Sequence, residues 1–136
     1  MASIYTNFST SQIAALSTAA IAGLGSADLA AFSTAQIQAL TATQAAVLTS
    51  SQLSWLSTSQ VPALSTDAIQ ALTTTAVKGL TTAGIVALST TQVEKLGTDQ
   101  IAALTTAQVK AIATDDLAKL STDQIKALSS AQVGAL

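Results

Sequence analysis

One eight-residue unit repeats through the whole chain. The 136 residues divide into 17 octads without a remainder or a change of phase. When octad positions are numbered 1 to 8, position 8 is Leu or Phe in 16 octads, and Ile112 is the exception. Position 5 is Ile, Val or Leu in 15 octads, with Tyr5 and Ala45 as the departures. Self-similarity at a fixed period is the signature of an array of like units, each of which must bury its apolar side chains on its neighbours.

The polar positions of the octad are typical of the start of a helix. Position 1 is Ser or Thr in 13 octads, and position 4 is Gln in 10. A Ser or Thr hydroxyl at the N-cap accepts a hydrogen bond from the amide three residues later, and a Gln at that place reaches back to the amide of the cap. The Leu before the cap and the Ile or Val at position 5 are spaced to form a hydrophobic staple. Each octad therefore predicts one short helix.

The charged residues indicate the same helix without any use of the apolar pattern. All six Asp residues fall at position 3 or 4, and all five Lys residues fall at position 6 or 7; only Glu94 departs from this sorting. Acidic residues in the first turn and basic residues in the last turn are favoured by the helix dipole.

Two other folds fit the period less well. In one continuous helix, eight residues advance by about 80° beyond two turns, so the leucines would wind around the rod and form no single face. In a β-solenoid, positions 5 and 8 have opposite parity and would point to opposite faces of a strand. Short helices are therefore favoured over both.

The sequence predicts an all-α solenoid of 17 short capped helices, one per octad, in a single array over residues 1–136. A helix of six or seven residues is not stable alone, because nucleation costs more than so few hydrogen bonds return. The octads offer almost no glycine for a left-handed helix end, so a corner between helices is more natural than a reversal. We expect three to five helices per superhelical turn, around an axis lined by positions 5 and 8.

Two residues depart visibly from the consensus. Trp55 stands at position 7, where Ala is usual, and that position also accepts Asn7, Lys95 and Lys119, so it must be partly open to solvent. Trp55 is the one candidate interaction residue, for a protein or glycan partner; the alternative is a large side chain that covers a local groove. Pro62 lacks an amide near the middle of its helix and predicts a distorted or shortened helix there.

Composition argues against most kinds of chemistry. The chain has no His, Cys or Arg, which removes most nucleophile–base pairs, zinc sites and phosphate clamps. Asp115 and Asp116 are the only adjacent acids, and neighbours on a helix do not face each other. We therefore expect no enzyme activity, no catalytic or metal-binding residue and no cofactor.

Charge and hydropathy limit the kinds of partner that the chain can have. A net charge of −2 with only five Lys leaves no basic patch for nucleic acid. Polar residues recur in every octad, so we expect no membrane insertion. No positively charged segment followed by an apolar one stands near Met1, so we expect no ordinary secretory signal.

The last five octads, over residues 97–136, read GTDQIAAL, TTAQVKAI, ATDDLAKL, STDQIKAL and SSAQVGAL. This pattern resembles the octapeptide arrays of very large bacterial proteins that are labelled haem-utilisation or adhesion proteins, and the resemblance covers the whole chain. It implies an extracellular or cell-surface protein in which the array is a spacer or assembly region. We expect no haem site in this chain, because His and Cys are absent and Met1 is the only Met.

Three functions follow as hypotheses. The leading one is a structural stalk, spacer or self-assembling module of a bacterial surface or exported adhesion-type protein. The alternative is a peptide- or protein-binding scaffold that uses an exposed face near Trp55. Ice binding through the recurrent Thr at position 2 is the third. Because the array ends in phase at Leu136 and its end octads should expose apolar faces, we expect either a longer array or end-to-end self-association.

Overall fold

The computed structural model describes residues 3–136, and Met1 and Ala2 of the predicted array lie outside the described residues. Seventeen short elements follow one another in the described part, one per octad, and no strand occurs among them. The α-helices are α1 (Thr10–Ala14), α2 (Thr18–Ala22), α3 (Ser26–Ala31), α4 (Thr34–Gln38), α5 (Ala42–Ala45), α6 (Ser50–Ser54), α7 (Thr66–Ala71), α8 (Thr74–Val77), α9 (Thr82–Ala87), α10 (Thr90–Glu94), α11 (Thr98–Ala103), α12 (Thr106–Ala111), α13 (Thr114–Leu117), α14 (Thr122–Ala127) and α15 (Ser130–Gly134). The two 3-10 helices are η1 (Ile4–Asn7) and η2 (Val61–Ala63).

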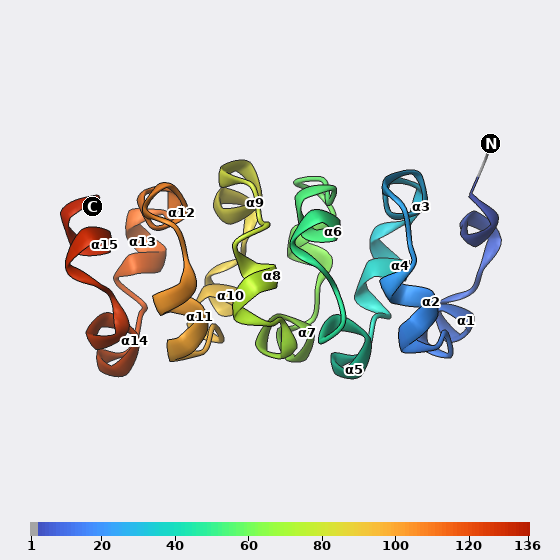
Figure 1. The fold of residues 1–136 in the computed structure, drawn as a ribbon, viewed down its shortest axis with the longest axis horizontal. Coiled ribbons are helices and arrows are strands. Elements are labelled where there is room, and N and C mark those ends of the chain that lie inside the picture. The colour runs from blue at the N-terminus through green and yellow to red at the C-terminus, as the bar shows by residue number, and fades with distance from the viewer. Residues whose placement is uncertain (1–2) are drawn as a thin grey trace.

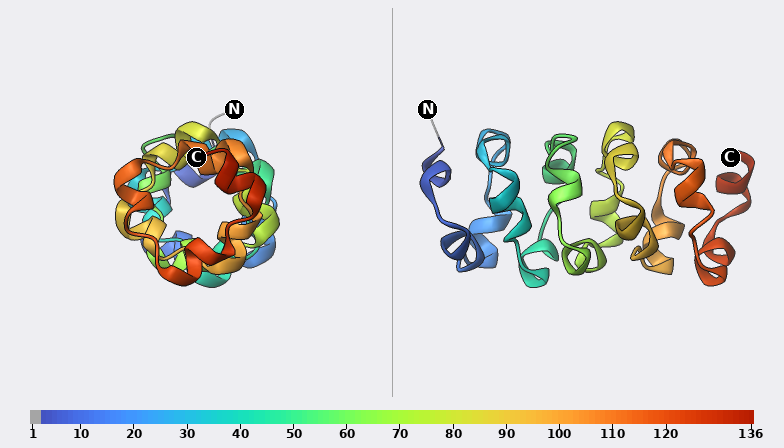
Figure 2. Two further views of the ribbon diagram at one scale, coloured as in Figure 1. Left: turned by 90° about the vertical axis from the view of Figure 1, so that its left-hand side faces the viewer. Right: turned by 180° about the vertical axis from the view of Figure 1, so that it is seen from behind.

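The helices wind around a common axis as a solenoid, which confirms the predicted fold class (Figure 1). Most helices pack on the third element before them and the third after them, as α11 does on α8 and α14. Side chains also bond to the fourth octad before their own, as the Gln100 amide does to the carbonyls of Ile69 and Leu72. One superhelical turn therefore holds between three and four octads, within the predicted range. The view along the axis shows the helices as a ring (Figure 2).

Side chains of positions 5 and 8 fill the centre of that ring. Position-5 residues of the interior octads are 0–2% exposed, with Ile21, Ile69 and Ile101 at 0%, and the Leu residues of position 8 are nearly as well buried. Burial of a side chain of this size stabilises a fold by about 1.5–3 kcal/mol. Because the helices have only four to six residues, this burial holds them in place, not their own hydrogen bonds.

The corner between successive helices consists of two extended residues. Leu104, at position 8, has φ −59° and ψ 141°, and the cap residue Thr105 has φ −70° and ψ 160°. The Leu104 amide donates to the carbonyl of Ile101 at 3.2 Å and so closes the last turn of the helix. No residue within 3–136 has a positive φ. Two extended residues redirect the chain without a left-handed residue, which explains why the octad needs no glycine.

Local departures from the octad change the helix but not the path of the array. Residues 58–60 form a turn and Val61–Ala63 a 3-10 helix, so the distortion predicted at Pro62 is confirmed. The caps at Gly25, Gly97 and Ala113 offer no side-chain acceptor, because these residues have no side-chain oxygen.

Candidate functional site

The glutamine at position 4 bonds in two directions, and Gln108 shows both. Its Oε1 accepts a hydrogen bond from the Thr105 backbone N–H at 2.9 Å, and its own backbone N–H donates to Thr105 Oγ1 at 3.1 Å. This is the predicted capping box. Its Nε2 donates to the carbonyls of Val77 and Leu80, both at 2.8 Å, on the preceding superhelical turn. One side chain thus starts its own helix and ties that helix to the turn below.

Eight further glutamines repeat the bonds to the preceding superhelical turn. Their Nε2 atoms donate to carbonyls of positions 5 and 8, four octads earlier, at 2.7–3.2 Å. We call these nine side chains the axial glutamines: Gln36, Gln44, Gln52, Gln60, Gln92, Gln100, Gln108, Gln124 and Gln132. All nine are buried, and no buried side-chain polar atom within the described residues lacks a hydrogen-bond partner.

The sequence did not predict the axial bond, because the capping box alone accounts for a Gln at position 4. A capping box accepts Glu as readily as Gln. Position 4 holds ten Gln residues and no Glu, although Glu94 shows that the chain does use this residue elsewhere. Only an amide can accept one hydrogen bond and donate others, so the exclusion of Glu was the available signal.

Three consecutive octads, over residues 65–88, have no glutamine that bonds to the preceding superhelical turn. Their position-4 residues are Ala68, Ala76 and Gly84, all of them buried. Their caps still accept the helix amide, as Thr73 Oγ1 does from Ala76 at 3.1 Å. The axial bond and the side-chain acceptor for the cap amide are therefore absent from these octads, while the cap hydroxyl keeps its bond.

The small side chains of this region are matched by a close approach between neighbouring turns. Gly79 lies against the backbone of Ser50, on the third octad before its own, so closely that an added Cβ would overlap the Ser50 carbonyl. Direct packing of backbone on backbone therefore joins α8 to α6 in this part of the solenoid.

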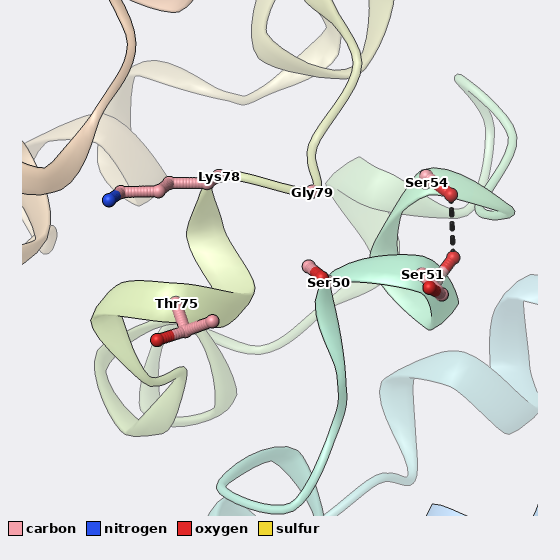
Figure 3. A pocket seen from close by; sticks show the side chains of 6 residues that line it. All are labelled: Ser50, Ser51, Ser54, Thr75, Lys78 and Gly79. Carbon is pink, nitrogen blue, oxygen red and sulfur yellow. Dashed lines mark hydrogen bonds between the residues drawn. The ribbon is translucent and has the colours of Figure 1, made fainter.

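An open hollow of about 460 Å³ lies at this contact between α6 and α8 (Figure 3). It is lined by Ser50, Ser51, Ser54, Thr75, Lys78 and Gly79. The Lys78 side chain points away from Ser51 and Ser54, and the Ser54 hydroxyl is already engaged, since it donates to the Ser51 carbonyl at 2.6 Å (Figure 3). The polar groups do not converge on a common point, which a ligand site requires.

Trp55 lies directly after α6, as its C-terminal cap, and its side chain is 40% exposed. The predicted openness of position 7 is thus confirmed at this residue. The other three aromatic residues lie together near the N-terminal end, where the Tyr5 ring packs edge-on against Phe8 at 5.3 Å and Phe32 at 6.0 Å between ring centres. Trp55 has no part in that cluster, and whether it binds a partner stays a prediction.

The adjacent acids do not form a pair. Asp115 is exposed, whereas Asp116 is buried and accepts a hydrogen bond from Thr90 Oγ1 at 2.6 Å. Asp116 stands at position 4, and a carboxylate there cannot donate to the turn below, so it bonds instead to a hydroxyl three octads earlier. Among residues 3–136, no group of three or more His, Cys, Asp or Glu could hold a metal ion.

The two ends of the solenoid differ from its interior. At the C-terminal end, position-5 residues lose their cover: Ile125 is 46% exposed and Val133 53%, and Leu136 is exposed beside them. At the N-terminal end, position 4 is open instead, at Ile4 and Gln12. We call these surfaces the C-terminal face and the N-terminal face. The C-terminal face presents apolar side chains and carbonyls, and the N-terminal face presents the Ile4 side chain and the Gln12 amide.

The comparisons with known proteins agree with the repeat. Residues 103–108 read Ala-Leu-Thr-Thr-Ala-Gln, which spans the end of one octad and the capping box of the next. The ALTTAQ repeat family matches residues 21–58, 77–114 and 109–136, and these ranges cover more than half of the chain. The chain belongs to the ALTTAQ repeat family. Residues 59–76, between the first two matches, hold Pro62 and Ala68, where these ALTTAQ repeats depart from their consensus. No curated protein and no solved structure matches the chain.

The predicted resemblance to octapeptide arrays is thus confirmed as far as the repeat itself is concerned, and its surface-adhesion part stays a prediction. Within residues 3–136, none of the helices combines the length and the apolar character that a membrane crossing requires.

Proposed function

We propose that these ALTTAQ repeats form a non-catalytic structural module that acts as a stalk or spacer in a bacterial surface or exported adhesion-type protein. The axial glutamines carry this proposal. They make the same bonds to the preceding turn on both sides of the central region, so each added octad extends the solenoid along one axis without a change in its cross-section.

The lateral surface supports a spacer over a specific binding face. Positions 2, 3 and 6 are mostly exposed, and they carry chiefly Ser, Thr and Ala with a few charges; Val86 is the one large apolar residue exposed among them within the described residues. With between three and four octads per turn, these positions are distributed around the solenoid and form no single flat face (Figure 2). The same distribution disfavours ice binding by the Thr residues of position 2.

An extracellular or cell-surface location is part of the proposal. It rests on the resemblance to bacterial adhesion arrays, and the absence of Cys is compatible with export as an unfolded chain.

Small-angle X-ray scattering on arrays of different length tests the spacer function. One variant carries an in-phase duplication of residues 97–128, and another lacks the same four octads. For a spacer, the maximum dimension should rise and fall by equal steps, while the radius of gyration of the cross-section stays constant. Growth in all dimensions would contradict the proposal. Light scattering on the same samples, extrapolated to low concentration, separates length from association.

Trp55 supports a second candidate, a peptide- or protein-binding scaffold, because a 40% exposed Trp is a common anchor at interfaces. Peptide and glycan arrays probed with the parent chain and with Trp55→Ala test this function. Binding to a defined probe that is lost in Trp55→Ala and kept in Lys95→Ala, at another exposed position 7, would favour the scaffold. Equal binding by all three chains would exclude Trp55 as the anchor.

A further inference from the structure

We propose that a calcium ion binds between two superhelical turns, at the octad where the acid Asp116 takes the place of an axial glutamine. Its ligands are the Asp116 carboxylate, the backbone carbonyls of Ile85 and Leu88, and the hydroxyl of Thr90. This site goes beyond the proposed spacer function, and neither proposal depends on the other.

The Asp116 carboxylate is buried with only a neutral partner. Asp116 is 7% exposed, and the hydrogen bond from Thr90 Oγ1, at 2.6 Å, is the one that its carboxylate accepts within residues 3–136. Asp28, the other acid at position 4, accepts instead from the backbone N–H of its cap residue Gly25 at 3.1 Å. A buried charge in a protein is usually paired with an opposite charge or bound to a metal ion. A neutral hydroxyl does not compensate the charge of Asp116.

The register of the array brings two carbonyls to the same place. Gln108 and Gln124 stand at position 4 of the octads before and after that of Asp116. Both donate to the carbonyls of positions 5 and 8, four octads earlier. Position 4 of the octad between them therefore faces the carbonyls of Ile85 and Leu88. No side chain within the described residues donates to either carbonyl.

The hydrogen bond from Thr90 places the carboxylate near the second of these carbonyls. Thr90 follows Leu88 by two residues, and α13, which carries Asp116, packs on α10, which begins at Thr90. The Asp side chain is one methylene shorter than that of Gln. Its carboxylate therefore stops short of carbonyls of the kind that Gln124 Nε2 reaches at 2.7–3.2 Å. An ion about 2.3–2.6 Å from each oxygen spans the remaining separation.

The four ligand groups offer hard oxygen atoms and one negative charge. Ca²⁺ takes about six to eight such ligands in a flexible geometry, whereas Mg²⁺ requires a near-ideal octahedron. Thr90 and Asp115 are exposed, so water molecules can complete the coordination of an ion from that side. A single carboxylate predicts weak binding, with a dissociation constant of about 10⁻⁴–10⁻³ M.

The residue types of the sequence gave no sign of this site. Three of the four ligand groups are neutral, and two of these are backbone carbonyls, which every residue carries. The carboxylate belongs to an octad four places after that of Ile85 and Leu88. The proposal therefore revises the expectation that the chain has no metal-binding residue.

Three substitutions separate this site from ordinary surface charge. Asp116→Asn removes the negative charge at nearly constant size, and Asp116→Gln supplies the amide of an axial glutamine, so both should abolish binding. Asp116→Gln is expected to fold, because ten octads already carry Gln at position 4. Asp115→Asn makes the same change at the exposed neighbour and is the matched control. Circular dichroism checks that each variant is folded before binding is measured.

Isothermal titration calorimetry of CaCl2 into the chelator-treated protein, at constant ionic strength, measures binding. We expect the parent and Asp115→Asn to bind a single ion with the same affinity, and both Asp116 variants to bind at least about tenfold more weakly. Thermal melts give a second readout. About 10 mM CaCl2 should raise the melting temperature of the parent but not that of Asp116→Gln, and MgCl2 should have a smaller effect.

A parent that binds no calcium would overturn this inference, and so would Asp116→Gln with an unchanged affinity. An equal loss of affinity in Asp115→Asn and Asp116→Asn, or an equal response of the parent to MgCl2, would assign the binding to surface charge and would also overturn it. None of these results bears on the spacer function, which is judged from the length of the array.

Discussion

At the scale of single residues, the fold depends on one side chain with two functional ends. Gln108 shows why position 4 selects an amide: its oxygen satisfies the first amide of a helix, and its nitrogen satisfies two carbonyls of the turn below. Neither a carboxylate nor a hydroxyl can do both over this distance. The residue therefore connects local helix formation to stacking of the turns.

Gln108→Glu separates these two roles. The capping-box acceptor is retained, but both donors are lost and a buried carboxylate faces two carbonyls, so we expect a loss of about 3 kcal/mol in the free energy of unfolding. Urea denaturation at neutral pH measures the loss. Gln38→Glu, an exposed control, should change stability by less than about 0.5 kcal/mol. Protonation restores one donor, so the deficit should shrink toward about pH 4, and a constant deficit would argue against the axial bond as its cause.

A missing cap can be restored at Ala113. This N-cap has no side-chain acceptor, whereas most other caps accept a bond from the amide three residues later. Ala113→Ser should raise the free energy of unfolding by about 0.5–1 kcal/mol. The control Ala107→Ser places the same side chain on the exposed surface of α12, where no gain is expected. Thermal melts followed by circular dichroism compare the two, and an equal effect of both would contradict a capping role.

Much of this residue-level chemistry could be predicted from the sequence. Ser and Thr at position 1 and Gln at position 4 carry a local signal, because a capping box joins residues only three apart. The axial bond joins residues 28 and 31 apart, as in the contacts of Gln108 with Leu80 and Val77. Its partners are backbone carbonyls, which leave no trace in residue type, so only the exclusion of Glu pointed to it.

At the scale of the helix, the corner between successive helices and the contact between turns have different structural causes. Two extended residues form the corner, and the octad encodes them directly through the cap. The spacing between turns depends on which side chains meet there, and small residues allow the close approach of Gly79 to Ser50. That approach joins octads that lie far apart in sequence, so the sequence alone did not reveal it.

Gly79→Ala tests this contact between turns. The added methyl group would overlap the Ser50 carbonyl, and the backbones must separate, so we expect a loss of about 1–3 kcal/mol. Gly134→Ala is the matched control in α15, where nothing lies within 4 Å of an added Cβ, and a gain of up to about 1 kcal/mol is expected there from helix propensity. Chemical denaturation of both variants measures the difference, and a neutral Gly79→Ala would mean that the two turns are not in firm contact.

At the scale of the whole molecule, the solenoid is a nearly one-dimensional array in which each octad packs chiefly on those three or four places away. The sequence predicted the number of units and the axis of Leu and Ile residues, because both follow from the period. The superhelical turn was predicted only as a range, because it depends on how the side chains pack between turns.

The stability of such an array depends more on whether a deletion keeps the octads in phase than on how many residues it removes. Deletion of residues 105–112 removes one complete octad and lets every later octad keep its neighbours in register, so a single cooperative melt at slightly lower temperature is expected. Deletion of residues 105–108 removes half as many residues but leaves an uncapped half-octad, so a broadened or two-step melt is expected. Thermal unfolding followed by circular dichroism distinguishes the two, and the opposite order of stability would contradict the octad as the structural unit.

The interruption of the axial glutamines over residues 65–88 has a mechanical consequence. Under tension along the axis, turns of a coil separate one after another, and the hydrogen bonds between them act as ties in series. Ala68, Ala76 and Gly84 supply no such tie, and the carbonyl of Leu48, one of those they would reach, receives no side-chain donor within the described residues. When the array is stretched, the turns around residues 65–88 should therefore separate first. The turns on either side, which the axial glutamines join, should separate only at a higher force.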